Sequence, residues 1–208
     1  MVEGGDGADT LTGAAGDDQL YGEAGDDTIE GGIGADVISG GLGTDTATYA
    51  NSTAGVSIDL TAGPASGGEA AGDVLSGIED LIGSNFDDVF TGTADINKLL
   101  GGDGNDTLQG LGGNDTLTGG NGSDTFIMGE GDGDNIVHGG DGGGWTDAIV
   151  LLNADTSSVG SGWTVDVTSG SVTGDDGSSM TLTDDAVGTI TLEDGSEISF
   201  DGIERIDY

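Results

Sequence analysis

The residues of this sequence that are best suited to chemistry are aspartates that recur every nine residues. Asp is a short, stiff carboxylate that favours turns and supplies oxygen ligands to hard cations. In the first part of the chain each unit opens with a glycine, carries Asp at its sixth position and an apolar residue at its eighth. The glycines are Gly4, Gly13, Gly22, Gly31 and Gly40, the aspartates are Asp9, Asp18, Asp27, Asp36 and Asp45, and the apolar residues are Leu11, Leu20, Ile29, Ile38 and Ala47.

A second run with the same period opens at Gly83 and includes units that begin at Gly101, Gly110 and Gly119. Its sixth positions are Asp88, Asn97, Asp106, Asp115 and Asp124, and its eighth positions are Phe90, Leu99, Leu108, Leu117 and Phe126. A shifted unit from Gly129 adds Asp134 and Ile136, after which the period breaks. Because an amide is a weaker cation ligand than a carboxylate, we expect Asn97 to bind less well than its Asp neighbours.

The units resemble the GGxGxDxUx nonapeptide repeats of the RTX (repeats-in-toxin) family, also called hemolysin-type calcium-binding repeats. About eleven units carry the resemblance, over roughly half of the chain. It implies an all-β fold, a right-handed parallel β-roll (β-helix) with Ca²⁺ between stacked turns. Two units would make one coil, so that alternate turns stack on opposite edges of the roll.

Each part of a unit has a physical role in such a roll. The first six residues are expected to turn a corner with their carbonyl groups directed inward, and glycine tolerates the positive φ that such a corner requires. The last three residues are expected to form a short strand. Because side chains alternate along a strand, only its middle residue points into the core, which accounts for one apolar residue in nine.

The ligand chemistry favours Ca²⁺, which takes six to eight oxygen ligands. There is no Cys and one His, so sites for zinc or copper have few of their usual ligands. Carbonyl groups and one Asp from each of two neighbouring turns would complete a site, which predicts roughly seven to ten ions. The predicted ligand residues are Asp9, Asp18, Asp27, Asp36, Asp45, Asp88, Asp106, Asp115, Asp124 and Asp134, with Gly4, Gly13, Gly22, Gly31, Gly40, Gly101, Gly110 and Gly119.

The net charge of −38, with only two basic residues, disfavours nucleic acid and anionic membranes as partners. A disordered acidic tail would lack the fixed apolar period. One buried apolar side chain per unit cannot offset the entropy of ordering nine residues, so we expect the chain to fold only when Ca²⁺ binds. No segment reaches transmembrane length and no signal peptide is present, which favours a fragment of a longer secreted protein.

The sequence divides into four predicted segments. Residues 1–48 form the first repeat block, 49–82 a β spacer with a protruding loop, 83–144 the second block and 145–208 an antiparallel C-terminal β cap. A hairpin is expected at Asp194 and Gly195, and Trp145 and Trp163 are expected to pack where roll and cap meet. The spacer loop is a possible partner-binding element.

These features predict a calcium-binding structural module of a secreted bacterial RTX protein, located outside the cell or on its surface. Catalysis is not expected, because His138 is the sole histidine and neither HExxH nor GxSxG occurs. The alternative is a subunit of a Ca²⁺-stabilised adhesin or filament that assembles end to end with itself or with other domains, because the first coil has no cap. Ice binding is disfavoured, because Gln19, Tyr21, Glu30, Lys98 and Leu100 interrupt the outward threonines.

Overall fold

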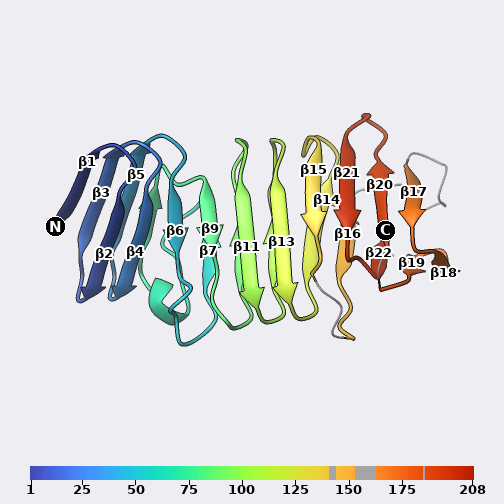
Figure 1. Cartoon of the computed structure of the whole chain (residues 1–208), viewed down its shortest axis with the longest axis horizontal. Coiled ribbons are helices and arrows are strands. Elements are labelled where there is room, and N and C mark those ends of the chain that lie inside the picture. The colour runs from blue at the N-terminus through green and yellow to red at the C-terminus, as the bar shows by residue number, and fades with distance from the viewer. Residues whose placement is uncertain (141–143, 153–162, 185) are drawn as a thin grey trace.

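The computed structural model describes residues 1–140, 144–152, 163–184 and 186–208. Part of the predicted second block (141–143) and part of the predicted cap (153–162 and 185) lie outside the described residues. The strands stand side by side along one long axis, with the N-terminus at one end (Figure 1). From β1 to β6 and again from β9 to β16, consecutive strands alternate between the ten-stranded sheet and the sheets opposite it. The chain therefore winds as a coil of parallel strands, which confirms the predicted fold class.

The described strands form three sheets. The four-stranded sheet contains β1 (Val2–Asp6), β3 (Gln19–Ala24), β5 (Val37–Leu42) and β8 (Val74–Ser76). The ten-stranded sheet contains β2 (Thr10–Ala15), β4 (Thr28–Ile33), β6 (Thr46–Thr48), β9 (Asp80–Ile82), β11 (Lys98–Asp103), β13 (Thr116–Asn121), β15 (Asn135–His138), β21 (Glu197–Asp201), β20 (Val187–Thr191) and β17 (Thr164–Ser169). The eight-stranded sheet contains β7 (Ser57–Asp59), β10 (Val89–Thr91), β12 (Thr107–Gln109), β14 (Thr125–Gly129), β16 (Ala148–Leu152), β22 (Arg205–Asp207), β19 (Ser179–Leu182) and β18 (Val172–Asp175).

The eighth-position residues form the core, as predicted. Leu20 pairs in register with Val2 on one side and with Ile38 on the other, so successive coils place equivalent side chains above one another. The core residues of the two repeat blocks are at most 3% exposed: Leu11, Leu20, Ile29, Ile38, Ala47, Phe90, Leu99, Leu108, Leu117 and Phe126. Because every strand contributes only about one such side chain, the core is a narrow column between the sheets.

The prediction for the last unit was wrong by one residue. Leu117 pairs with Val137, which is fully buried, whereas Ile136 is 46% exposed. The turn from Gly129 is longer than its neighbours, so Asp115 lies 20 rather than 18 residues before its partner in the next coil. A one-residue slip moves each side chain to the opposite face of a strand, which explains why Ile136 points to solvent.

The division of each unit into turn and strand also differs from the prediction. Six-residue strands such as β2 and β4 run through the first three positions of the next unit, which leaves three residues for the turn. Positive φ occurs at the second and fourth positions, as at Gly5 and Gly7, and not at the glycine that opens the unit. Backbone conformation therefore does not explain why glycine opens each unit.

The spacer extends the coil. Strands β6 and β9 pair directly, although 34 residues separate Thr46 from its partner Asp80. Between them the chain contributes β7 to the eight-stranded sheet and β8 to the four-stranded sheet, with a short 3-10 helix, η1 (Gly68–Ala70), between these two strands. The spacer thus adds β7 and β8 to the two sheets opposite β6 and β9. The short helix η1 lies on the loop that joins β7 to β8 (Figure 1).

The C-terminal region is only partly the antiparallel cap that was predicted. Strands β17, β20 and β21 pair antiparallel, as do β18, β19 and β22. However, β21 and β22 also pair parallel with β15 and β16, so they form one more coil of the roll. The expected hairpin at Asp194 and Gly195 connects β20 and β21 and is confirmed. None of the described segments is a helix of the length and hydrophobicity needed to cross a lipid bilayer.

The two tryptophans differ in their surroundings. Trp163 is 2% exposed and its ring lies 4.8 Å from that of Tyr208, so it packs within the C-terminal region. Trp145 is 39% exposed, so the expectation that it is packed at the junction was wrong.

Glu23 gives a test of the turn geometry, because it occupies a second position with φ of 78° and its side chain is exposed. We expect Glu23→Gly to raise the free energy of unfolding by roughly 0.5–1 kcal/mol, since glycine removes the left-handed strain at a smaller entropic cost. Thermal unfolding in Ca²⁺ measures the effect. Glu23→Ala is the control, because it removes the same charge and keeps the strain; equal gains from both variants would contradict this explanation.

Candidate metal centre

The sixth-position aspartates form a hydrogen-bonded ladder along each edge of the roll. The backbone N–H of Asp9 donates to Oδ1 of Asp27 at 2.8 Å, and the N–H of Asp27 donates to Oδ1 of Asp45 at 2.8 Å. Similar bonds join Asp106 to Asp124 in the second block. In Asp27, Asp45 and Asp124, one carboxylate oxygen therefore fixes the stacking of two turns, and the other remains for a different role.

The ladders include residues that the sequence analysis missed. One edge carries Asp9, Asp27, Asp45, Glu79, Asn97, Asp115 and Asn135. The other edge carries Asp18, Asp36 and Asp73, and then Asp88, Asp106, Asp124, Asp147 and Glu204. Each missed residue is an acid or amide two positions before a buried apolar residue or a strand's central residue, as in Asp147 and Ile149. That spacing was a usable signal, although Glu79, Asn135 and Glu204 lack the glycine five residues upstream that opens a regular unit.

Seven ladder aspartates have a second carboxylate oxygen that is buried and accepts no hydrogen bond among the described residues. They are Asp9, Asp27, Asp36, Asp45, Asp106, Asp115 and Asp124. A buried carboxylate oxygen without a partner is costly, so native proteins normally pair it with a donor or a cation. The pattern repeats in turn after turn, which indicates a common missing partner of positive charge.

The opening glycine explains where that partner would lie. A methyl group built on Gly4 would be 2.8 Å from Oδ2 of Asp9 and 2.9 Å from the carbonyl oxygen of Gly22 in the next turn of the same edge. The equivalent position on Gly22 is close to Oδ2 of Asp27 and 2.5 Å from the carbonyl oxygen of Gly40. Two oxygens from neighbouring turns thus converge beside Gly4, Gly13, Gly22 and Gly40, where only the absence of a side chain leaves room. Beside Gly31, Gly101, Gly110 and Gly119, Oδ2 of the sixth-position Asp lies similarly close. This donor set fits a hard cation such as Ca²⁺.

In two turns at the start of the second block, groups of the same turn donate hydrogen bonds to the sixth-position side chain. Oδ2 of Asp88 accepts hydrogen bonds from the backbone N–H of Ser84 at 2.6 Å and from the Ser84 hydroxyl at 3.1 Å. In the next unit, Oδ1 of Asn97 accepts from the N–H of Thr93 at 2.7 Å. These side chains satisfy themselves within their own turns, so neither Asp88 nor Asn97 leaves an oxygen for a metal ion.

Asp134 does not occupy the position predicted for it. The longer turn puts Asn135 on the ladder, where its Oδ1 accepts from the N–H of Asp115 at 2.8 Å and its side chain is buried. Asp134 is exposed, and its N–H donates to Oδ1 of Asn114 at 3.1 Å. The two extra residues in the turn therefore replace the expected carboxylate with a neutral amide.

A second ladder runs along the outside of the turns, at the fifth position, and the sequence analysis did not anticipate it. Oδ1 of Asp17 accepts from the N–H of Ala35 at 3.0 Å, and Oδ1 of Asn105 accepts from the N–H of Ser123 at 2.9 Å. Here the donor lies in the later turn, whereas in the sixth-position ladder it lies in the earlier turn. The two ladders therefore connect neighbouring turns in opposite directions.

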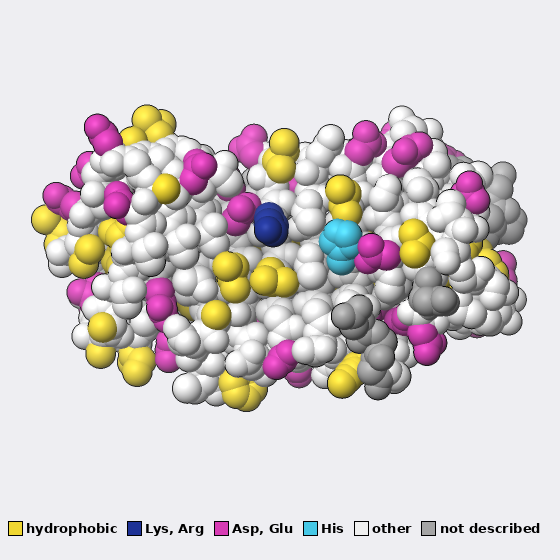
Figure 2. Space-filling view, viewed as in Figure 1, with side chains coloured by type: hydrophobic (Ala, Val, Ile, Leu, Met, Phe, Trp, Pro, Cys, Tyr) yellow, Lys and Arg dark blue, Asp and Glu magenta, His cyan; other side chains and the backbone are white. Residues whose placement is uncertain are grey.

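The ladder carboxylates lie in an unfavourable electrostatic environment. Burial is the main cause that raises the pKa of Asp106 to about 7 and the pKa of Asp115 and Asp124 to about 6. Burial also raises the pKa of Asp45, and the neighbouring carboxylate of Asp27 raises it further. Other acidic side chains spread along both long edges of the visible face (Figure 2). The folded turns thus concentrate negative charge that needs compensation.

The remaining titratable groups do not form a side-chain metal site. Nδ1 of His138 lies 2.9 Å from Oδ1 of Asp201, and both side chains are partly exposed on the roll. Among the described residues, no three or more His, Cys, Asp or Glu side chains are arranged to hold a metal ion. The cradles beside the opening glycines instead combine one carboxylate with a backbone carbonyl.

Acid should stabilise the roll when Ca²⁺ is removed. The pKa values of Asp106, Asp115 and Asp124 are higher in the folded chain than the ordinary value of 3.8, so the folded state binds more protons. Their contribution is fully present below about pH 4 and is lost as the pH rises through about 6 to 7. We expect circular dichroism in chelator to show more β structure, or a higher Tm, at about pH 4.5 than at about pH 7.5. The opposite order would contradict this account.

A comparison with protein families identifies the repeats of both blocks. A protein-family model described as the RTX calcium-binding nonapeptide repeat matches in four copies, over residues 2–29, 15–47, 91–126 and 100–133. The turn closed by Asp88 lies outside these matches. RTX repeats bind Ca²⁺.

Similarity to whole proteins is weaker. The crystal structure of the extracellular lipase LipA from Serratia marcescens matches at 19% identity and a TM-score of 0.27, over 97% of this chain and 37% of the lipase. This chain thus spans little more than a third of the lipase's length, and so low a TM-score supports no functional argument. A search of curated proteins found no match. The family model thus matches residues in both predicted repeat blocks, and in both blocks the strands stack in parallel register.

Proposed function

We propose that this chain is a Ca²⁺-binding structural module of a secreted protein, which folds outside the cell when Ca²⁺ binds. The observation that carries the proposal is the set of seven buried carboxylate oxygens without a partner among the described residues. Each is the second oxygen of an Asp whose first oxygen already joins two turns, or, for Asp9, of the Asp that begins a ladder. A cation at these positions would bind neighbouring turns together and neutralise their charge.

The proposed ligands follow from the geometry of the cradles. Each ion would take Oδ2 of a sixth-position Asp and carbonyl oxygens from two turns of one edge, including that of the next opening glycine. We retain Asp9, Asp18, Asp27, Asp36, Asp45, Asp106, Asp115 and Asp124, with Gly4, Gly13, Gly22, Gly31, Gly40, Gly101, Gly110 and Gly119. Asp88 and Asp134 leave the set for the reasons given above. One ion for each unpartnered oxygen gives about seven ions, at the lower end of the expected range.

Charge repulsion explains why folding would depend on the ion. With a net charge of −38, the chain without Ca²⁺ must bring many carboxylates together as the turns stack. Millimolar extracellular Ca²⁺ would compensate this charge, whereas the Ca²⁺ level inside a cell is far lower. Calcium ions are accordingly the main proposed partners, and the same charge argues against nucleic acid. We propose a non-catalytic role and the four segments 1–48, 49–82, 83–144 and 145–208.

A Ca²⁺ titration followed by far-ultraviolet circular dichroism tests the module. We expect a cooperative gain of β signal with Ca²⁺ and none with Mg²⁺, because Mg²⁺ dehydrates reluctantly and needs a smaller octahedral site. Chelator should reverse the gain. A β spectrum that is the same with and without chelator at neutral pH would show that the fold stands without the ion.

A second candidate function is end-to-end assembly into an adhesin or filament, with a second copy of this chain as the partner. It is favoured by the first coil, where β1 and β2 are the end strands of their sheets. The carboxylates of Asp9 and Asp18 accept no backbone N–H among the described residues, unlike Asp27 and Asp36 one coil later. Sedimentation velocity in Ca²⁺ would show species that grow with protein concentration, whereas a single monomer boundary would exclude this function.

Two matched substitutions distinguish a Ca²⁺ ligand, Asp106, from an Asp with a purely structural role, Asp88. We expect Asp106→Asn to reduce the number of bound Ca²⁺ ions by one or two, because it removes a carboxylate oxygen from a cradle. Asp88→Asn should leave the number of ions unchanged, although it disturbs the bonds to Ser84 and lowers Tm. Equilibrium dialysis with Ca²⁺ measures the stoichiometry. An equal loss of ions in both variants would contradict the distinction between open and closed turns.

A further inference from the structure

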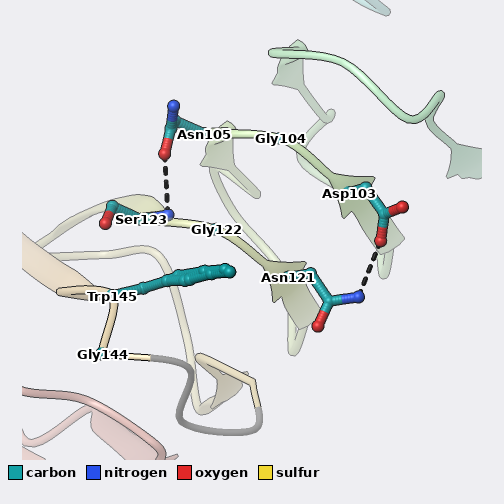
Figure 3. A pocket seen from close by; sticks show the side chains of 8 residues that line it. All are labelled: Asp103, Gly104, Asn105, Asn121, Gly122, Ser123, Gly144 and Trp145. Atoms are coloured by element: carbon teal, nitrogen blue, oxygen red, sulfur yellow. Dashed lines mark hydrogen bonds between the residues drawn. The ribbon is translucent and has the colours of Figure 1, made fainter.

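An open hollow of about 660 Å³ lies on the outer side of the turns that follow β11 and β13, and it has no role in the proposed calcium sites. Its polar side chains come from two consecutive turns of one edge: Asp103 and Asn105 from the first, Asn121 and Ser123 from the second. Trp145, from the next turn of that edge, forms a third side. Glycines fill the remaining wall, so the backbone is accessible between the side chains (Figure 3).

The polar side chains are held in place by bonds between the turns. Nδ2 of Asn121 donates to Oδ1 of Asp103 at 2.7 Å, and the N–H of Ser123 donates to Oδ1 of Asn105 at 2.9 Å. Within the described part of the chain, Oδ2 of Asp103 and Oδ1 of Asn121 accept no hydrogen bond. The hollow thus offers preorganised acceptors and an amide donor, which lowers the entropic cost of binding a polar ligand.

Trp145 gives the hollow an apolar side. Its indole ring extends beside the backbone of Gly122 toward Asn121 (Figure 3). The residue is 39% exposed, whereas Trp163 is buried. An exposed indole is a large apolar surface with one polar N–H group, and Trp is enriched at binding interfaces.

A sugar has the matching chemistry. One face of a pyranose ring presents C–H groups that stack on an aromatic ring, and its rim presents hydroxyl groups that both donate and accept hydrogen bonds to carboxylate and amide groups. The strongly negative net charge of the chain disfavours acidic sugars as ligands. We propose that this hollow binds a neutral glycan, stacked on Trp145 and hydrogen-bonded to Asp103 and Asn121.

The surface next to the hollow favours a chain of sugars over a single unit. A second hollow of about 520 Å³ shares Asp103 and Asn121 with the first and continues past Leu100 to His138 and Asp201. The shared pair lines both hollows. An oligosaccharide that extends from one hollow into the other would use these acceptors and would gain contacts with the partly exposed Leu100, His138 and Asp201.

Binding is tested on the whole chain in saturating Ca²⁺, by tryptophan emission and calorimetry with cellohexaose, mannohexaose and maltohexaose as probes. We expect saturable binding of at least one probe with a change in emission, since Trp145 is the exposed indole. Trp145→Ala and Asp103→Ala should each weaken binding at least ~10-fold, because each removes one of the few strong contacts. Asp6→Ala is the matched control, because Asp6 occupies the same unit position at a turn without a nearby Trp, and it should bind normally.

The experiment separates this inference from the proposed function, because circular dichroism on the same samples reports folding independently. If Trp145→Ala reduces the β signal, Trp145→Phe is used in its place. This variant should bind the probes more weakly than the parent chain and have the same circular dichroism spectrum. The glycan site is excluded if the folded chain binds none of the three probes, or if Trp145→Ala binds them as well as the parent chain. Binding of tetramethylammonium without any binding of the probes would assign the hollow to a cation on the indole face instead and would overturn the proposal.

Discussion

Most turns of this roll depend on how a buried aspartate uses its two oxygens. One oxygen accepts a backbone N–H from the neighbouring turn of the same edge and sets the register of the stack. The other points beside the opening glycine, toward a carbonyl oxygen of the next turn. Because this second oxygen is charged, buried and without a partner among the described residues, stacking concentrates charge wherever it buries apolar side chains. A bound cation would neutralise this charge and give the oxygen a partner.

The narrow core explains why this compensation matters. Each strand buries about one aliphatic or aromatic side chain, so hydrophobic packing alone is a weak source of stability for so many ordered residues. The interruptions of the repeat follow the same logic. Asp88 turns its second oxygen to Ser84, and Asn135 replaces a carboxylate by an amide, so these turns stack without a cation. The roll therefore contains two runs of turns with an unpartnered carboxylate oxygen, and turns without one lie between and after these runs.

The edges of the roll have two sides with different uses. The inner side of each turn presents the carboxylate and carbonyl oxygens of the cradles. The outer side presents the fifth-position ladder, together with third-position side chains such as Asp103 and Asn121 that remain open to solvent. A regular stack thus displays a row of polar groups at fixed spacing, and the addition of one exposed indole at Trp145 converts part of that row into a candidate binding surface.

The sequence by itself determined the period, the core residues at the eighth positions, the parallel coil and most carboxylates of the ladders, because these features repeat with one constant spacing. It could not determine which carboxylates keep a free oxygen. Asp88 and Asp106 occupy the same unit position, and only the tertiary contacts show that Ser84 satisfies the first and leaves the second open. The tertiary structure also decided the shift from Asp134 to Asn135, the late ladder members Asp147 and Glu204, and the exposure of Trp145. The physical reason is that stacking brings together residues from different coils, and insertions change their separation along the chain while the distance between turns stays the same.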